Sequence, residues 1–329
     1  MVQKTANLHR LCEKIIIDIE PKETCFRMTE TIFMRAEPLV SSMKNKISQD
    51  VVRLKEERKI SPKLVALLIG NDPVSRTYVD LKTKDCEDVG ILSEVADLSS
   101  LPKEDAAGKV LERISKLNED PSVNAVIPQM PFDQKVSEEQ VFSALSPMKD
   151  VDGLTAFRLG KLIRKEYLLE DSILPCTPKG IMLLLKYYKV ELSGADVAII
   201  GRSTLVSEPL RKLMQDADGT ATCYHTHSKN LSSKIKEADI VVAASGRPPE
   251  LYGSSGFRLT GEMVKLGCVV VGVGVRRDTQ ANKMLFDVDT KSMNGICSFL
   301  TPNTGGVGAM TRAVLVQNTV IAAKLQSQL

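Results

Sequence analysis

The chain has 329 residues, of which 43% are hydrophobic and 26% are charged. That length predicts two compact domains at roughly 150 residues each. The 44 Lys and Arg residues are nearly balanced by 41 Asp and Glu residues, and the net charge of +3 argues against nucleic acid or an anionic membrane as the main partner. No apolar run approaches the roughly 18 residues that span a bilayer. Composition therefore predicts a soluble globular protein.

The cysteine and histidine content argues against a metal site. The seven cysteines are odd in number and dispersed, and no C-x-x-C pair occurs among them. This pattern is typical of a reducing compartment rather than of a disulfide framework or a zinc site. The N-terminal Lys4, His9 and Arg10 suggest an organelle-targeting segment, but acidic residues from Glu13 onward interrupt it. We expect a cytoplasmic protein, with the mitochondrion as the alternative.

The first half of the chain alternates helical and strand patterns. Apolar residues recur at helical spacing over 39–54, and 64–69 reads as a short buried strand. Asp72 is a good N-cap for a helix over 73–89, and 123–127 reads as a second buried strand. Strands that alternate with helices predict an α/β fold with a largely parallel sheet.

A second alternating unit begins after residue 178. It contains predicted strands at 197–200, 220–223, 239–244 and 268–273, a helix from residue 209 and a last helix over about 308–325. The spacing resembles that of a nucleotide-binding Rossmann unit. We place the domain boundary between residues 162 and 178.

The turn after strand 197–200 is a candidate cofactor site. Gly201-Arg202-Ser203 stands where a strand turns into a helix, so its backbone N–H groups face a potential anion. The turn is not G-x-G-x-x-G, and an ordinary strand–helix turn is an equal alternative. Residues 224–229, at the end of the next strand, include no acid to hold the ribose hydroxyls of NAD. This basic, hydroxyl-rich rim favours NADP over NAD.

Tyr78 and Lys82 are candidates for a substrate site. They are four residues apart on the predicted helix and share one face. A partly buried lysine has a lowered pKa and serves as an acid or base near neutral pH. A solvent-facing lysine paired with an acid is the alternative. Gln129 and Asp152, taken singly, are equally compatible with ordinary loop positions.

Six motifs occur in an order that resembles the bifunctional methylenetetrahydrofolate dehydrogenase/cyclohydrolase family. They lie at residues 70–86, 126–131, 149–154, 175–181, 201–206 and 305–311. The resemblance extends from about Leu64 to the C-terminus, and the first sixty residues match poorly. It implies oxidation of 5,10-methylenetetrahydrofolate with transfer of a hydride to a nicotinamide. Hydrolysis of the 5,10-methenyl product to 10-formyltetrahydrofolate follows in the same cleft.

The resemblance also implies a domain organisation. Residues 1–170 form an α/β folate-binding catalytic domain, and residues 171–304 form a Rossmann-type NAD(P)-binding domain. Residues 305–329 form a C-terminal helix that packs back on the first domain. The implied partners are tetrahydrofolate derivatives and a second copy of the chain in a homodimer, with no nucleic acid and no membrane.

The resemblance assigns roles to individual residues. Tyr78 stacks on the folate ring, Lys82 shuttles protons during hydrolysis, and Gln129 holds Lys82 in position. Asp152 accepts hydrogen bonds from the pterin. The remaining implied contacts are Gly305 and Gly306 for substrate, and Gly201, Arg202, Ser203, Val206, Thr226, Ser245, Gly246 and Thr311 for cofactor. No residue is assigned to a metal.

Several positions depart from the family pattern. In the first half of the chain, Ala125 stands where the strand that leads to Gln129 usually has glycine, and four more departures lie in the second half. Ser207 stands where the phosphate turn usually has glycine, and Gly272 where a later strand has aspartate. Thr304 and Ala309 replace prolines beside the Gly305-Gly306 pair. These departures keep two alternatives open, an NAD-dependent enzyme with dehydrogenase activity alone and a non-catalytic protein that binds folate or nucleotide. Lys82 and Gln129 favour the bifunctional enzyme. A basic residue near the turn, Arg202, favours NADP.

Overall fold

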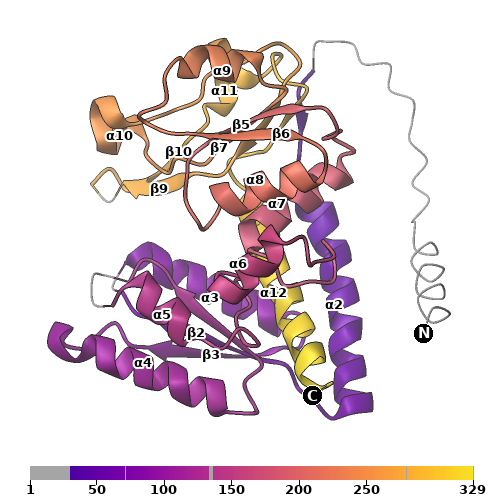
Figure 1. Ribbon diagram of the computed structural model, residues 1–329, viewed down its shortest axis with the longest axis vertical. Coiled ribbons are helices and arrows are strands. Elements are labelled where there is room, and N and C mark those ends of the chain that lie inside the picture. The colour runs from indigo at the N-terminus through magenta and orange to yellow at the C-terminus, as the bar shows by residue number, and fades with distance from the viewer. Residues whose placement is uncertain (1–29, 71, 133–135, 279, 329) are drawn as a thin grey trace.

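The computed structural model describes residues 30–328, except 71, 133–135 and 279. Two α/β domains lie one above the other, and two long helices run side by side from the junction of the domains down along the first domain (Figure 1). The N-terminal segment with Lys4, His9 and Arg10 lies outside the described residues. Within the described residues, none of the helices combines the length and the apolar character needed to traverse a bilayer.

The first domain is built on a parallel sheet with strand order β3-β2-β4 in the described chain. Its strands are β2 (Lys63–Leu68), β3 (Leu92–Asp97) and β4 (Ala125–Gln129). Its helices are α2 (Glu37–Arg58), α3 (Pro73–Glu87), α4 (Lys103–Glu119), α5 (Glu138–Ala144) and α6 (Ala156–Ile163). The structure confirms the predicted helices over 39–54 and 73–89 and the predicted strands at 64–69 and 123–127, with ends shifted by a few residues.

Alternation along β2 explains why this sheet has helices on both faces. Leu64, Ala66 and Leu68 are buried in one apolar core together with residues of α2 and of the C-terminal helix. Val65 and Leu67 are buried in a second core against α4 and α5. Successive side chains of a strand point to opposite faces, so an uninterrupted apolar strand requires cover on both sides.

The second domain contains a six-stranded parallel sheet with strand order β1-β11-β8-β7-β5-β6 in the described chain. Its strands are β1 (Ile32–Phe33), β5 (Asp196–Ile200), β6 (Thr220–Tyr224), β7 (Ile240–Ala243), β8 (Val269–Gly272) and β11 (Phe299–Leu300). The other elements are α7 (Cys176–Tyr187), α8 (Ser207–Asp216), α9 (Leu231–Glu237), α10 (Pro249–Tyr252), α11 (Thr290–Met293), the hairpin β9 (Val275–Asp278) and β10 (Lys283–Phe286), and the 3-10 turns Gly253–Ser255 and Gly261–Met263. The four strands predicted in this half are β5, β6, β7 and β8.

Strand β1 differs from the expected division of the chain. We assigned residues 1–170 to the first domain, but Ile32 pairs with Phe299 and Phe33 with Leu300. The described chain therefore begins in the second sheet and enters the first domain through α2. A two-residue strand has no periodicity of its own, and its partner lies far away in the sequence.

The C-terminal helix α12 (Val307–Gln326) joins the two domains. It packs against α7, α2 and α3, and Figure 1 shows it running down into the first domain beside α2. Arg312 forms an ion pair with Asp85 of α3 at 2.6 Å. The buried Asn318 donates hydrogen bonds from Nδ2 to the carbonyl oxygens of Val151 at 2.8 Å and Leu174 at 3.0 Å. These contacts fix α12 to the loops that lead from one domain to the other.

Lys179 of α7 is an ionisable group in this interdomain core. Its side chain is fully buried, and Nζ donates to the Ser172 carbonyl oxygen at 2.9 Å and to Asn318 Oδ1 at 3.2 Å. Both acceptors are neutral. Burial lowers the pKa of Lys179 to about 8, because desolvation disfavours the charged amine.

Replacement of Lys179 by Met should flatten the dependence of stability on pH. Below pH 8 the amine is protonated in the folded and unfolded states, and the full desolvation cost applies. Between pH 8 and 10.5 the folded state has lost a proton that the unfolded state keeps, so the unfolding free energy of the wild type rises with pH. We expect a rise of about 2 kcal/mol between pH 8 and pH 10 that is absent from Lys179→Met.

Urea unfolding at both pH values measures this difference. Lys186→Met is the control, because the Lys186 side chain on the same helix is exposed and pairs with Glu170 at the surface. A wild-type slope that survives in Lys179→Met would contradict the assignment.

Candidate active-site cleft

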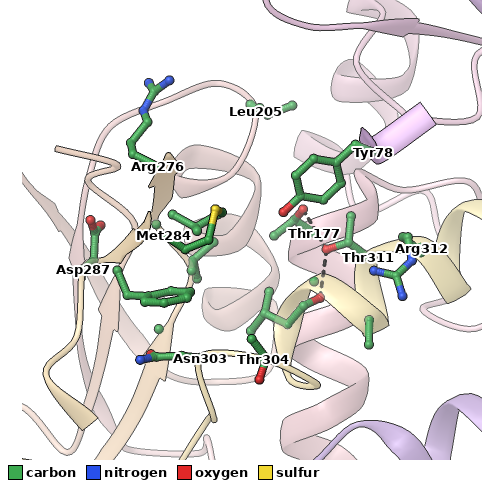
Figure 2. Close-up of a pocket in the computed structure, with 18 of the residues that line it drawn as sticks. Tyr78, Thr177, Leu205, Arg276, Met284, Asp287, Asn303, Thr304, Thr311 and Arg312 are labelled. Atoms are coloured by element: carbon green, nitrogen blue, oxygen red, sulfur yellow. Dashed lines mark hydrogen bonds between the residues drawn. The ribbon is translucent and has the colours of Figure 1, made fainter. Parts of the chain in front are cut away.

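A cleft of about 590 Å³ lies between the two domains. Figure 2 shows Tyr78, Thr177, Thr311 and Arg312 on one side and Met284, Asp287 and Asn303 on the other. Six of the residues selected from the sequence line it, namely Tyr78, Lys82, Gln129, Asp152, Gly305 and Thr311. Helix α3 supplies the first two of these on one face, as the spacing of four residues predicted.

Lys82 and Gln129 form a hydrogen-bonded pair in the cleft. Lys82 Nζ donates to Gln129 Oε1 at 2.8 Å, and Gln129 Nε2 donates to the carbonyl oxygen of Met130 at 2.9 Å. The second bond fixes the orientation of the amide and directs its oxygen to the lysine. The structure therefore joins Gln129 to Lys82 by a hydrogen bond, and the positioning role that the resemblance implies for Gln129 stays a prediction.

Burial lowers the pKa of Lys82, and the negative charge of Asp152 opposes this effect. Arg312 adds to the lowering by charge repulsion, while its own charge is paired with Asp85. A lysine whose pKa moves toward neutrality exchanges protons more readily at physiological pH than an exposed lysine does. The cleft thus contains an amine whose pKa is lowered by its surroundings.

The neighbours of Asp152 hold it at the edge of the cleft. Asp150 is fully buried and accepts hydrogen bonds from the backbone N–H groups of Gly153 and Thr155, both at 2.8 Å. The carbonyl oxygen of Val151 accepts from Asn318 of α12. Of the two acids in this turn, Asp150 is occupied in holding the loop, and Asp152 lines the cleft.

The predicted phosphate turn follows β5. Gly201 has a φ of +146°, and a Cβ at this position would lie 2.6 Å from both the Ala244 carbonyl oxygen and Ser207 Oγ. Only glycine fits this approach. The Ser203 hydroxyl accepts from the N–H of Val206 at 3.2 Å at the start of α8. Glycine at 201 is therefore required by the packing of the turn itself.

The predicted cofactor residues at this edge do not line the main cleft. Gly201, Arg202, Ser203 and Val206 follow β5, and Thr226 follows β6, whose Tyr224 carbonyl accepts from the Gly201 N–H at 2.8 Å. Leu205, between them, does line the cleft. The turn therefore adjoins the cleft at one end.

A carboxylate that the sequence did not single out organises the turn after β7. Asp287 Oδ2 accepts from the Ser245 N–H at 2.6 Å, the Ser245 hydroxyl at 2.8 Å and the Gly246 N–H at 2.8 Å. Burial raises the pKa of Asp287, and these hydrogen bonds oppose the rise. We expect Ser245 and Gly246 to bind cofactor, but in the structure their backbone N–H groups and the Ser245 hydroxyl donate hydrogen bonds to Asp287. The residues of this contact are more than forty positions apart in the sequence, so no local sequence pattern predicts it.

The Gly305-Gly306 loop is shaped by close contacts. A Cβ on Gly306 would lie 2.8 Å from the Pro302 carbonyl oxygen, and the Gly305 carbonyl accepts from the Ala36 N–H at 2.8 Å. The hydroxyls of Thr177 and Thr311 lie 3.0 Å apart across α7 and α12. Gly305 lines the cleft, and Gly306 is buried behind it.

Four residues that depart from the family pattern, Ser207, Gly272, Thr304 and Ala309, do not fill the cleft. Ser207 is fully buried, so its side chain packs within the turn near Gly201 and does not project into the cleft. Gly272, Thr304 and Ala309 line the cleft. The Gly272 N–H donates to Thr301 Oγ1 at 2.7 Å, which keeps the end of β8 ordered.

This arrangement defines a class of protein. A Rossmann-type sheet forms one wall of an interdomain cleft, and a paired amine and a carboxylate lie on the opposite wall. Such a site suits an enzyme that combines a nicotinamide cofactor with proton transfer.

Comparison with known proteins gives the family. The model of the tetrahydrofolate dehydrogenase/cyclohydrolase catalytic domain matches residues 34–152, and that of the NAD(P)-binding domain of the same family matches residues 175–327. The chain belongs to the tetrahydrofolate dehydrogenase/cyclohydrolase family. The match begins at residue 34, so α2, which precedes the first recognised motif, is part of the family's catalytic domain.

Individual relatives cover most of the chain. "Bifunctional protein FolD" of Pyrobaculum aerophilum is 42% identical over 292 residues, which are 88% of this chain and 93% of that protein. The protein of the same name from Halalkalibacterium halodurans is 37% identical over 293 residues, 89% of this chain and 99% of its own. The crystal structure of the bifunctional FolD enzyme of Campylobacter jejuni has a TM-score of 0.80 and 34% identity, and the match covers 90% of this chain and 99% of that one.

A change at the phosphate turn should disrupt the second domain. In Gly201→Ala the added methyl group would collide with the backbone of Ala244, so we expect destabilisation by about 1–3 kcal/mol. Gly160→Ala is the control, because a methyl group on Gly160 of α6 meets no atom within 4 Å and alanine favours a helix by roughly 0.5–1 kcal/mol. Thermal unfolding of the two variants should move in opposite directions. Equal midpoints would contradict the packing described.

Proposed function

We propose that the chain oxidises 5,10-methylenetetrahydrofolate to 5,10-methenyltetrahydrofolate with NADP and hydrolyses the product to 10-formyltetrahydrofolate. The observation that carries the proposal is the Lys82–Gln129 pair beside Asp152 on one wall of the cleft, opposite a Rossmann-type domain. Membership of the family supports it, as does the bifunctional name of relatives more than 30% identical.

The residues at the edge of the second sheet fit NADP. Residues 224–229 contain no carboxylate for the ribose hydroxyls, and the adjoining turn carries the exposed Arg202. A related structure from Trypanosoma brucei, with 25% identity and a TM-score of 0.80, is described as a complex with NADP and an inhibitor. When bound, the nicotinamide accepts the hydride from the one-carbon unit. We assign Arg202, Ser203 and Thr226 to the adenosine end of this cofactor.

The first wall of the cleft would orient the folate. Tyr78 offers an aromatic face for the pteridine ring, and Asp152 accepts hydrogen bonds from the pterin amino and ring N–H groups. The Gly305 backbone borders the same space. Such contacts position the one-carbon bridge without a protein acid, which suffices for the oxidation.

Hydrolysis requires proton transfer, and Lys82 is the group placed for it. In its neutral form the amine takes a proton from the water that attacks the methenyl carbon and then returns it to the departing folate nitrogen. The second proton of that water is released to solvent as its oxygen becomes the formyl carbonyl, because the methenyl group is a cation and the formyl group is neutral. Gln129 keeps Nζ directed into the cleft throughout. Burial lowers the pKa of Lys82, which favours the neutral amine that this proton transfer requires.

Both alternatives make distinct predictions in one assay. An NAD-dependent enzyme with dehydrogenase activity alone would reduce NAD and accumulate the methenyl compound. A non-catalytic protein would bind ligand without turnover. Purified protein with methylenetetrahydrofolate and either NADP or NAD, followed by absorbance, separates them. We expect NADP reduction without accumulation of the methenyl compound.

Substitution of Lys82 should separate the two activities. Lys82→Met removes the proton carrier, and we expect cyclohydrolase activity to fall by about a hundredfold or more while dehydrogenase activity remains measurable. Lys84→Met, two residues along α3 and exposed, should leave both unchanged. Equal loss of the two activities in Lys82→Met would refute the assignment.

We also propose a homodimer in the cytoplasm. The family resemblance supports the dimer, and Phe157, Ile163 and Leu168 are exposed by 50%, 59% and 68% on and just after α6, which is apolar surface available for contact. The five described cysteines are free thiols, in keeping with a reducing compartment. Sedimentation at micromolar concentration tests the dimer, and a monomer mass would contradict it.

A further inference from the structure

We infer that Arg276, on the β9–β10 hairpin, binds the pyrophosphate of the dinucleotide cofactor. This inference rests on the proposed function. Arg276 lines the cleft from the second-domain side, and Figure 2 shows it at the same end of the cleft as Leu205, which belongs to the turn before α8. The turn before α8 and the hairpin thus flank the entrance.

The backbone N–H groups of the turn after β7 are engaged within the protein, so binding of a phosphate beside this turn requires a cationic side chain. Ser245 and Gly246 present their N–H groups to Asp287 Oδ2, and the Arg247 N–H is directed to Ser245 Oγ at 3.2 Å. Backbone donors that are engaged with a carboxylate are not available to a phosphate without breaking those bonds. The turn after β7 therefore offers an anion little direct support.

Arg276 is fixed directly over that turn. Its Nε donates to the Gly246 carbonyl oxygen at 3.0 Å, and this anchor leaves the two terminal nitrogens of the guanidinium for another acceptor. No ion pair joins Arg276 to a carboxylate of the described residues. A guanidinium held by Nε presents a planar pair of donors that matches two phosphate oxygens.

The other cations of the described cleft lining lie on the first-domain side and have partners. Lys82 is bonded to Gln129, and Arg312 is paired with Asp85. The first turn of α8 carries an acid, Glu208, whose charge is paired with Arg211 of the same helix at 2.9 Å. Arg276 is the cation of the described cleft lining that lies on the second-domain side.

The strand geometry of β9 provides a matched control. Arg277 follows Arg276, and neighbouring side chains of a strand point to opposite faces. Arg277 Nη2 donates to Asn282 Oδ1 at 2.7 Å within the hairpin, and Arg277 does not line the cleft. Arg276→Gln and Arg277→Gln therefore remove the same charge from adjacent positions, only one of which faces the cofactor.

Isothermal titration calorimetry with NADP⁺ and with NAD⁺ tests the inference. Arg276→Gln should weaken the binding of both dinucleotides equally, by about tenfold, because both contain the pyrophosphate. Arg276→Lys should recover part of the affinity, and Arg277→Gln should bind as the wild type does. The cyclohydrolase reaction needs no dinucleotide, so its unchanged rate in Arg276→Gln reports an intact fold and folate site.

Other outcomes overturn the inference. Weakening confined to NADP⁺ would place Arg276 at the 2′-phosphate. Weakened binding of a folate with a glutamate tail, with dinucleotide binding unchanged, would place it at the tail carboxylates. Unchanged binding of every ligand would leave Arg276 outside the site while the proposed function stood. A wild-type protein that binds neither dinucleotide would overturn both the inference and the proposed function.

Discussion

Desolvation of the Lys82 side chain is the physical constraint on which the site depends. A partly buried ammonium requires an acceptor, and a charged acceptor opposes the lowering of its pKa by burial whereas a neutral one does not. Gln129 accepts the hydrogen bond without a negative charge, so the lysine is held in place while its pKa stays low. A carboxylate at position 129 would hold the amine equally well but would stabilise its protonated form and oppose its service as a base.

Helix α12 contacts several of the elements that surround Lys82. Asn318 binds the Val151 carbonyl next to Asp152, Arg312 pairs with Asp85 on the helix that bears Lys82, and Thr311 meets Thr177 at the interdomain face. One element thus fixes the folate side of the cleft and begins at the loop that faces the cofactor side. The two halves of the proposed reaction share a site because this helix belongs to both domains.

Local patterns were sufficient to predict much of this site. The spacing of Tyr78 and Lys82 predicted that both side chains share one face, and both line the cleft. The buried runs at 64–69 and 197–200 correspond to β2, the central strand of the first sheet, and β5, an interior strand of the second. Strand β3 was missed because it is an edge strand on which Ala96 is the single buried residue. Strand β1 was missed because its two residues become a strand only by pairing with residues 299–300, which lie far away in the sequence.

The contacts that the sequence did not reveal are long-range. Asp287 and Arg276 act on the turn at 245–246 from thirty or more residues away, and neither lies in a recognised motif. Ser207 stands where the phosphate turn of the family usually has glycine, and its burial at the start of α8 was not evident from that position alone. In each case the role of the side chain depends on its position in the folded protein, which a short stretch of sequence does not reveal.

A crystal structure with NADP and a stable tetrahydrofolate analogue would show whether Lys82 faces the reacting carbon. We expect the pteridine against the Tyr78 ring, its amino group within about 3 Å of an Asp152 oxygen, and Lys82 Nζ directed at the one-carbon position. A pteridine bound outside the cleft, or a Lys82 ammonium turned into bulk solvent in that complex, would contradict this expectation.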